Sequence, residues 1–149
     1  MPRDIPFYQQ ETRYSCAPAC LRMVMESLGV IATEAEIRER CECDEEGTAF
    51  KKIAAGASTY GFQESWALSL GIDEDAGFTK LQELLRNGAN PIVYLRILPF
   101  PHYPHAVVVC KLTTDAVEVL DPHYGQRQIK LPRFLADWTD TRQVTVFIG

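Results

Sequence analysis

The spacing of apolar residues changes at Pro91. Before this position, apolar residues recur three and four positions apart, as they do on the buried face of a helix. After it, short runs of β-branched and aromatic residues are typical of strands. Helices followed by strands predict an α+β fold. The 149 residues fit a single domain, residues 1–149, with one core.

Four helices are predicted before Pro91, each from its apolar spacing and its end signals. Thr33 and Glu36 form a capping-box pattern, and Thr79 and Gln82 repeat that pattern further along. Glycine residues then supply C-terminal stops. The predicted helices cover residues 16–28, 33–40 and 48–60, and a fourth runs from Thr79 to just before Gly88.

Five strands are predicted after Pro91, and we expect them to form an antiparallel sheet. They cover residues 92–95, 105–112, 116–120, 126–131 and 144–148. Residues 113–115 suit a hairpin between the second and third of these strands. A short helix is expected over residues 132–138, between the last two strands.

The charge pattern excludes some classes of partner. The net charge is −5, and no basic cluster is longer than Lys51-Lys52, so a nucleic-acid partner has no electrostatic support.

No apolar run approaches the length of a membrane span, and the first residues lack the apolar run of a signal peptide. We therefore expect a cytoplasmic protein with no membrane segment and no cofactor.

The five cysteines are odd in number and irregularly spaced, which favours free thiols in a reducing cytoplasm. Cys16 differs from the others because Pro18 fixes a helix start beside it. Proline is tolerated in the first helical turn, where its missing N–H had no intrahelical partner. The unpaired N–H groups and the dipole at this end favour a thiolate over a thiol. Cys16 is therefore a candidate nucleophile.

Two further motifs supply the other parts of a thiol-based catalytic site. His105 opens one predicted strand and Asp121 follows the end of the next, so a hairpin would bring them within hydrogen-bonding reach. An imidazole oriented by a carboxylate is the base that a thiolate nucleophile requires. Gln10 lies six residues before Cys16, and its amide could join the Cys16 N–H in an oxyanion hole. Gln9 is adjacent and could serve instead.

These residues resemble a known family. The run Tyr14-Ser15-Cys16-Ala17-Pro18-Ala19-Cys20-Leu21, with Gln10 before it, is similar to the nucleophile motif of bacteriocin-processing cysteine peptidases. That family removes double-glycine leader peptides and is often fused to export transporters. The stretches His105-Ala-Val-Val-Val and Val119-Leu120-Asp121-Pro122, with Gly125, are similar to its histidine and aspartate motifs.

The resemblance implies a papain-like fold, with an N-terminal helical lobe that bears the nucleophile and packs on a C-terminal antiparallel sheet. It also implies cleavage of a peptide or protein substrate through a thioester, after a Gly-Gly leader sequence. Two residues depart from the pattern: Ala17 stands where the family usually has glycine, and Ala106 where an aromatic residue is frequent. No transporter segment follows, so we expect any transporter to be a separate partner.

Several alternatives remain open. The same residues could hydrolyse an isopeptide or amide bond, or the chain could be a catalytically silent domain that binds a peptide or protein partner. His123 rivals His105 as the base, and His102 lies near both. Cys16 and Cys20 with a histidine could bind zinc, as could Cys41-x-Cys43, but structural zinc sites favour wider cysteine spacing. We expect no metal, and we expect Cys20 to lie in the core.

Overall fold

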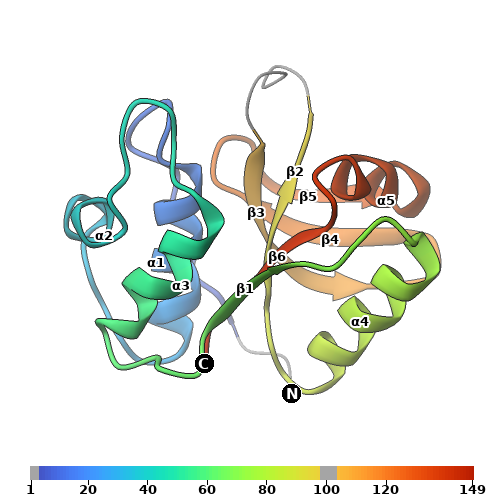
Figure 1. The fold of residues 1–149 in the computed structure, drawn as a ribbon, viewed down its shortest axis with the longest axis horizontal. Helices are drawn as coiled ribbons and strands as arrows, with labels where there is room; N and C mark the ends of the chain where they lie inside the picture. The colour runs from blue at the N-terminus through green and yellow to red at the C-terminus, as the bar shows by residue number, and fades with distance from the viewer. Residues whose placement is uncertain (1–3, 98–103) are drawn as a thin grey trace.

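A six-stranded antiparallel sheet organises the chain (Figure 1). The structure is a computed structural model that describes residues 4–97 and 104–149. The strands are β1 (Trp66–Ser69), β2 (Ile92–Leu95), β3 (His105–Leu112), β4 (Ala116–Asp121), β5 (Gly125–Lys130) and β6 (Val144–Phe147). Their order is β1-β6-β2-β3-β4-β5, and every neighbouring pair is antiparallel.

Helices cover both faces of this sheet. They are α1 (Cys16–Ser27), α2 (Glu34–Arg40), α3 (Phe50–Ser58), α4 (Glu74–Arg86) and α5 (Leu131–Thr139). Figure 1 shows α1, α2 and α3 together on one side of the strands and α4 and α5 on the other. The predicted α+β arrangement, a helical lobe packed on an antiparallel sheet, is confirmed.

Strand β3 divides the apolar residues into two cores, because successive side chains of a strand point to opposite faces. Ala106 and Val108 belong to the first core, which contains the apolar face of α1. Val107 and Val109 belong to the second core, beside Phe134 of α5. Ala106 and Val108 therefore form the surface of β3 on which α1 packs, and His105 is the first residue of that strand.

The predicted start of the fourth helix was wrong. Helix α4 begins at Glu74, where the side chain of Asp73 accepts a hydrogen bond from the N–H of Ala76 at 3.1 Å. Thr79 lies inside the helix and donates from its hydroxyl to the Asp75 carbonyl at 3.0 Å. Both residues have side chains suited to an N-cap, and Asp73 occupies that position, where its carbonyl accepts a hydrogen bond from Nε2 of Gln143 at 3.0 Å.

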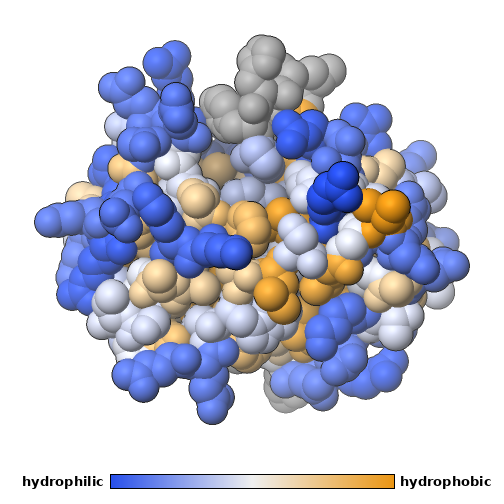
Figure 2. All heavy atoms as spheres, in the orientation of Figure 1, coloured by the Kyte–Doolittle hydropathy of each residue, from blue (hydrophilic) through white to orange (hydrophobic). Residues whose placement is uncertain are grey.

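Strand β1 was not predicted. It has only four residues and lies at the edge of the sheet, where Trp66 stacks on Phe147 of β6 at 5.7 Å between ring centroids. Leu68 is exposed, so the strand carries no clear alternation of buried and exposed residues. Figure 2 shows that hydrophobic residues gather near the middle of the viewed face, while hydrophilic residues surround them.

The other predicted elements match the structure to within a few residues. The hairpin over residues 113–115 is present, and the helix predicted from residue 48 begins at Phe50. The last helix spans Leu131–Thr139. His102 lies outside the described residues. Within the described ranges, no helix has the length and apolar character needed to cross a membrane.

Candidate active site

Cys16 is the first residue of α1, as predicted. Its side chain is largely buried, with 8% of the residue exposed, and the N–H of Ala106 donates to its Sγ atom at 3.5 Å. The N–H groups of the first helical turn have no partners within the helix. The sulfur therefore lies between the first turn of α1 and a backbone donor of β3.

His105 and Asp121 lie together at the end of the β3–β4 pair. The pairing of Val108 with Leu120 places Asp121 diagonally across from His105. The Nε2 atom of His105 lies 2.7 Å from Oδ1 of Asp121, and both side chains are buried. The predicted proximity of His105 and Asp121 is therefore present in the structure.

Two neighbours compete with burial to set the charge of the imidazole. Burial by itself would lower the pKa of His105, because it disfavours the charged form. Hydrogen bonds with Asp121 and Cys16 outweigh burial and raise this pKa to about 9. His105 therefore links the sulfur to the carboxylate, and the structure brings these three predicted residues together.

Asp121 is held by several donors in addition to His105. Burial acts to raise the pKa of its carboxyl group, but the hydrogen bond with His105 and backbone N–H groups lower it overall. Those N–H groups belong to His123, at 2.8 Å, and Tyr124, at 3.1 Å, and both donate to Oδ1. Nη1 of Arg127 lies 3.1 Å from Oδ2. The carboxylate is thus fixed in one orientation and in its ionised form.

Arg127 was missed in the sequence. It belongs to β5, where the pairing of Asp121 with Gly125 and of Val119 with Arg127 brings the guanidinium diagonally across from the carboxylate. The tight turn before Gly125 was visible in the sequence, so the hairpin register could have suggested this contact. An arginine two residues beyond a predicted turn is otherwise an ordinary surface residue.

Gln10 lies beside Asp121 through its backbone. Its N–H donates to the carbonyl of Pro122 at 2.8 Å, and its side-chain Nε2 donates to the carbonyl of Thr12 at 2.7 Å. Its Oε1 is buried and has no hydrogen-bond partner within the described residues. Gln9 is exposed. The structure therefore places Gln10, rather than Gln9, at the junction of the Cys16 and Asp121 segments.

The rival candidates occupy different positions. His123 is exposed, and its ring contacts the rings of Tyr124, at 4.4 Å, and of His105, at 6.4 Å between centroids. Its backbone N–H donates to Asp121. Cys20 is fully buried in the first core, as predicted, and burial raises the pKa of its thiol. Burial also raises the pKa of Cys41, to about 12. Among the described residues, no group of three or more His, Cys, Asp or Glu side chains could hold a metal ion.

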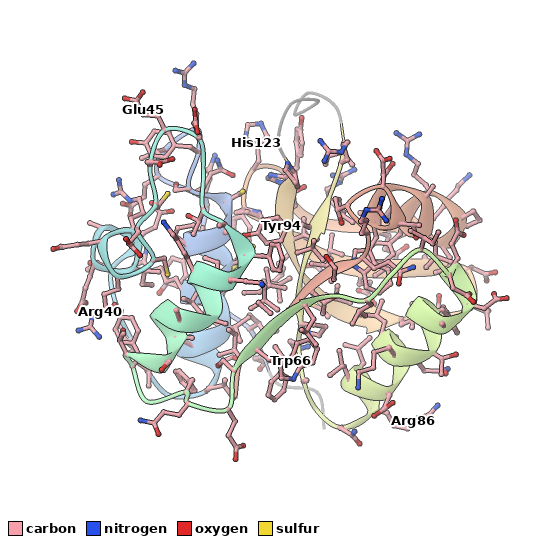
Figure 3. All side chains as sticks on the ribbon, in the orientation of Figure 1. Arg40, Glu45, Trp66, Arg86, Tyr94 and His123 are labelled. Carbon is pink, nitrogen blue, oxygen red and sulfur yellow. The ribbon has the colours of Figure 1, made fainter. Side chains whose placement is uncertain are left out.

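A cavity of about 440 Å³ lies between the helical lobe and the sheet. Thr48 and Phe50 line it from the helical side, and Tyr94 and Pro104 line it from the strands. The hydroxyl of Tyr94 donates to the carbonyl of Thr48 at 2.9 Å, which joins the two sides (Figure 3). Pro104 directly precedes His105 in the chain, but the described lining of this cavity includes neither His105 nor Cys16. A larger cavity, of about 630 Å³, is lined mainly by residues of β5 and α5.

A family model described as the Peptidase C39 family matches residues 4–146. The chain belongs to this family. It is therefore a cysteine peptidase, in agreement with the motifs around Cys16, His105 and Asp121.

Two relatives of this C39 peptidase differ greatly in length. An uncharacterised protein of Methanothermobacter thermautotrophicus is 30% identical over 127 residues, which are 85% of this chain and 78% of that protein. The lactococcin-G-processing and transport ATP-binding protein LagD of Lactococcus lactis is 28% identical over 133 residues. Those residues are 89% of this chain but only 17% of LagD.

Solved structures share the fold of this C39 peptidase. The peptidase domain of Streptococcus ComA, a bifunctional ABC transporter, matches with a TM-score of 0.81 at 20% identity, over 98% of each chain. A double-glycine-motif protease from an AMS/PCAT transporter, in complex with the leader peptide, matches with a TM-score of 0.73 at 18% identity. This match covers 99% of the present chain and 95% of the other.

Ala17 and Ala106 are the two positions at which the sequence of this C39 peptidase departs from the motifs described above. Both residues are buried in the first core, and the N–H of Ala106 donates to the Cys16 sulfur. An aromatic side chain at position 106 would meet α1, because Ala106 points toward that helix.

Proposed function

We propose that this C39 peptidase cleaves peptide bonds through a catalytic triad of Cys16, His105 and Asp121. The observation that carries the proposal is the buried chain of contacts from Cys16 to His105 and from His105 to Asp121. A packed structural cysteine would have no need of an imidazole that is itself bonded to a carboxylate. Asp121 accepts the Nε2–H of His105, which leaves the other ring nitrogen for the proton of Cys16.

The reaction begins with the Cys16 proton already held by His105, as the raised pKa of the imidazole favours, and the sulfur attacks the carbonyl carbon of the peptide. The new C–S bond pushes one electron pair onto the carbonyl oxygen. That pair then returns, the C–N bond breaks, and His105 gives its proton to the leaving amine. Water, deprotonated by His105, attacks the thioester and releases the acid and the Cys16 thiol.

The oxyanion that forms in each step needs hydrogen-bond donors. We assign this role to the N–H of Cys16 and the side-chain amide of Gln10. The Cys16 N–H lies at the start of α1, where backbone donors have no helical acceptor. Gln10 has two N–H bonds on Nε2, of which one serves Thr12, so the other remains for the oxyanion.

We propose that the substrate is a leader peptide that ends in Gly-Gly. Cys16 is only 8% exposed, so residues without side chains approach the sulfur most easily. The names of two similar proteins point in the same direction, since LagD processes lactococcin G and the AMS/PCAT protease acts at a double-glycine motif. We further propose a single domain over residues 1–149, a cytoplasmic location and an export transporter as partner.

Mass spectrometry of leader peptides tests this function. We expect wild-type protein to cleave a peptide directly after Gly-Gly, and we expect Cys16→Ala to leave it intact. Cys110→Ala is the matched control, because Cys110 is a half-buried thiol on β3 that takes no part in the proposed reaction. Cleavage of the peptide by Cys16→Ala would contradict the assignment of Cys16 as the nucleophile. Loss of cleavage in Cys110→Ala, in which Cys16 is intact, would also contradict it.

A further inference from the structure

The side chain of Glu34 is buried although the proposed reaction does not use it. Glu34 lies in the first turn of α2, and 1% of its side chain is exposed. Transfer of a carboxylate out of water is costly unless partners compensate. Burial raises the pKa of this group, and only its polar neighbours oppose that shift. The groups that bind the Glu34 carboxylate compensate for its burial, and the carboxylate in turn holds those groups in place.

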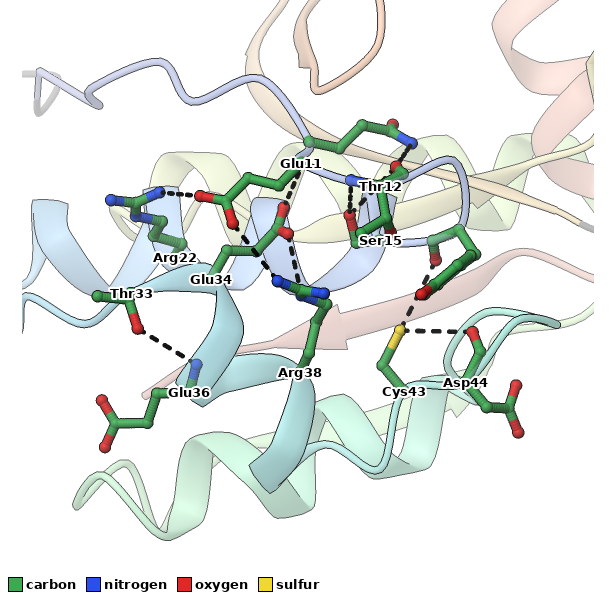
Figure 4. A network of polar contacts seen from close by, with 12 residues as sticks. Glu11, Thr12, Ser15, Arg22, Thr33, Glu34, Glu36, Arg38, Cys43 and Asp44 are labelled. Atoms are coloured by element: carbon green, nitrogen blue, oxygen red, sulfur yellow. Dashed lines mark hydrogen bonds and ion pairs between the residues drawn. The ribbon is translucent and has the colours of Figure 1, made fainter.

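The partners of Glu34 lie in the loop that leads into α1 (Figure 4). The N–H of Glu11 donates to Oε1 of Glu34 at 3.0 Å. The side chain of Ser15 also forms a hydrogen bond with the carboxylate, which acts to lower the Glu34 pKa. Ser15 is fully buried, and its hydroxyl accepts the N–H of Thr12 at 3.0 Å within the same loop. The hydroxyl also lies 3.2 Å from the Thr12 carbonyl, so its one proton is shared between that carbonyl and Glu34.

Two arginines hold the acidic groups of this network. Nε of Arg38, one turn along α2, lies 3.2 Å from Oε2 of Glu34. Nη2 of Arg38 lies 3.4 Å from Oε1 of Glu11, and Nη1 of Arg22 lies 3.5 Å from the other Glu11 oxygen. The network therefore ties α2 and α1 to the loop over residues 10–16. A loop held at both ends keeps fewer conformations than one held only by its own backbone.

The two residues that Glu34 holds are direct neighbours of the two oxyanion donors. Glu11 follows Gln10, and Ser15 precedes Cys16. On the other side of Gln10, its own N–H is held by the carbonyl of Pro122. We propose that Glu34 is a positioning residue that sets the distance between the Gln10 amide and the Cys16 N–H. This inference rests on the function proposed above.

The proposal requires an acceptor at position 34 and not merely a side chain of that shape. An amide at this position keeps one oxygen but replaces the other with a donor that faces Arg38. It cannot then accept from Glu11 and Ser15 while balancing the arginine charge. Loss of this contact would leave the triad intact, because within the described residues no hydrogen bond or ion pair joins Glu34 to His105 or Asp121.

The test compares Glu34→Gln with the matched control Glu36→Gln. Glu36 belongs to the same turn of α2 and also pairs with an arginine four residues later, Arg40 at 2.9 Å, but its side chain is exposed. We expect Glu34→Gln to lower kcat on the order of ten- to a hundredfold with little change in KM, since a displaced oxyanion donor acts in the transition state. We expect Glu36→Gln to behave like the wild type.

Two further readouts separate positioning from general structure. A peptide aldehyde forms a hemithioacetal with Cys16, whose oxygen occupies the oxyanion site, so its inhibition constant should rise in Glu34→Gln in proportion to the loss of kcat. Alkylation of Cys16 by iodoacetamide needs no oxyanion hole, and its rate should stay unchanged. Glu34→Asp, which keeps the charge but withdraws it from Glu11, should show the same pattern and serves if Glu34→Gln does not fold.

The outcomes distinguish the two proposals. A kcat of Glu34→Gln equal to that of wild type, or a parallel loss of turnover, alkylation rate and thermal stability in both variants, would overturn the role of Glu34 alone. Wild-type protein that neither cleaves Gly-Gly peptides nor binds the aldehyde would overturn the proposed function and, with it, the role of Glu34. A selective loss of turnover and aldehyde affinity would support both.

Discussion

The guanidinium of Arg127 lies 3.1 Å from one oxygen of Asp121, while the other oxygen lies 2.7 Å from the His105 ring. The carboxylate therefore links a partly exposed strand residue to the buried imidazole. Such a pair fixes Asp121 in the plane that His105 requires. The turn that contains His123 and Tyr124 adds two N–H donors to the same carboxylate.

Replacement of Arg127 with glutamine should weaken this orientation. Arg127 is partly exposed, so solvent screens its charge and the expected loss in kcat/KM is about two- to fivefold. Steady-state kinetics on a Gly-Gly peptide would measure it. Arg133→Gln is the control, because Arg133 pairs with Asp137 at 2.9 Å and does not contact Asp121. Equal kinetics for wild type and Arg127→Gln would contradict this role.

Replacement of Gln10 should identify the side-chain donor of the oxyanion hole. Gln10→Ala removes an amide at the junction of the Cys16 and Asp121 segments, and we expect kcat to fall on the order of a hundredfold. Gln9→Ala should leave kcat unchanged, because Gln9 is exposed. Single-turnover measurements of acyl-enzyme formation would detect the difference. A larger defect in Gln9→Ala would reverse the assignment.

The raised pKa of His105 should make part of the stability depend on pH. A group whose pKa is higher in the folded state stabilises the fold fully below its unfolded pKa, about 6.5, and loses that effect as the pH rises through its folded pKa. Here the folded pKa is about 9. The free energy of unfolding of wild type, relative to His105→Gln, should therefore decline between about pH 6.5 and 9.

Urea unfolding at a series of pH values would measure this decline. The lowered pKa of Asp121 has the opposite effect, because its contribution is lost as the pH falls into the acidic range. The difference between wild type and His105→Gln should thus be greatest in mildly acidic solution. A difference that stays constant from pH 6 to 10 would mean that His105 is not protonated in the folded protein.

The hydrogen bond from Tyr94 to Thr48 should stabilise the contact between the helical lobe and the sheet. Tyr94 is buried, so Tyr94→Phe leaves the Thr48 carbonyl without its partner and should lower the free energy of unfolding by about 1 kcal/mol. Tyr124→Phe is the control, since Tyr124 is exposed. Denaturant midpoints would compare them, and equal midpoints would show that the bond adds no net stability.

The sequence alone was sufficient to predict those features that depend on residues close together in the chain. Pro18 places the start of α1 at Cys16, and residues 113–115 close the β3–β4 hairpin, which brings His105 to Asp121. These features depend on backbone geometry over a few residues, and such geometry follows from residue type. The α+β class and the residues proposed for the triad could be predicted for this reason.

Tertiary packing decided what the sequence left open. Asp73 and Thr79 are both suitable N-caps, and only the packing of the chain around α4 selects the first. The edge strand β1 exists because β6 offers it a partner. Glu34 has the appearance of an exposed acid in a first helical turn, yet the loop over residues 10–16 buries it. Residues distant in sequence supply these environments, so residue type alone could not determine them.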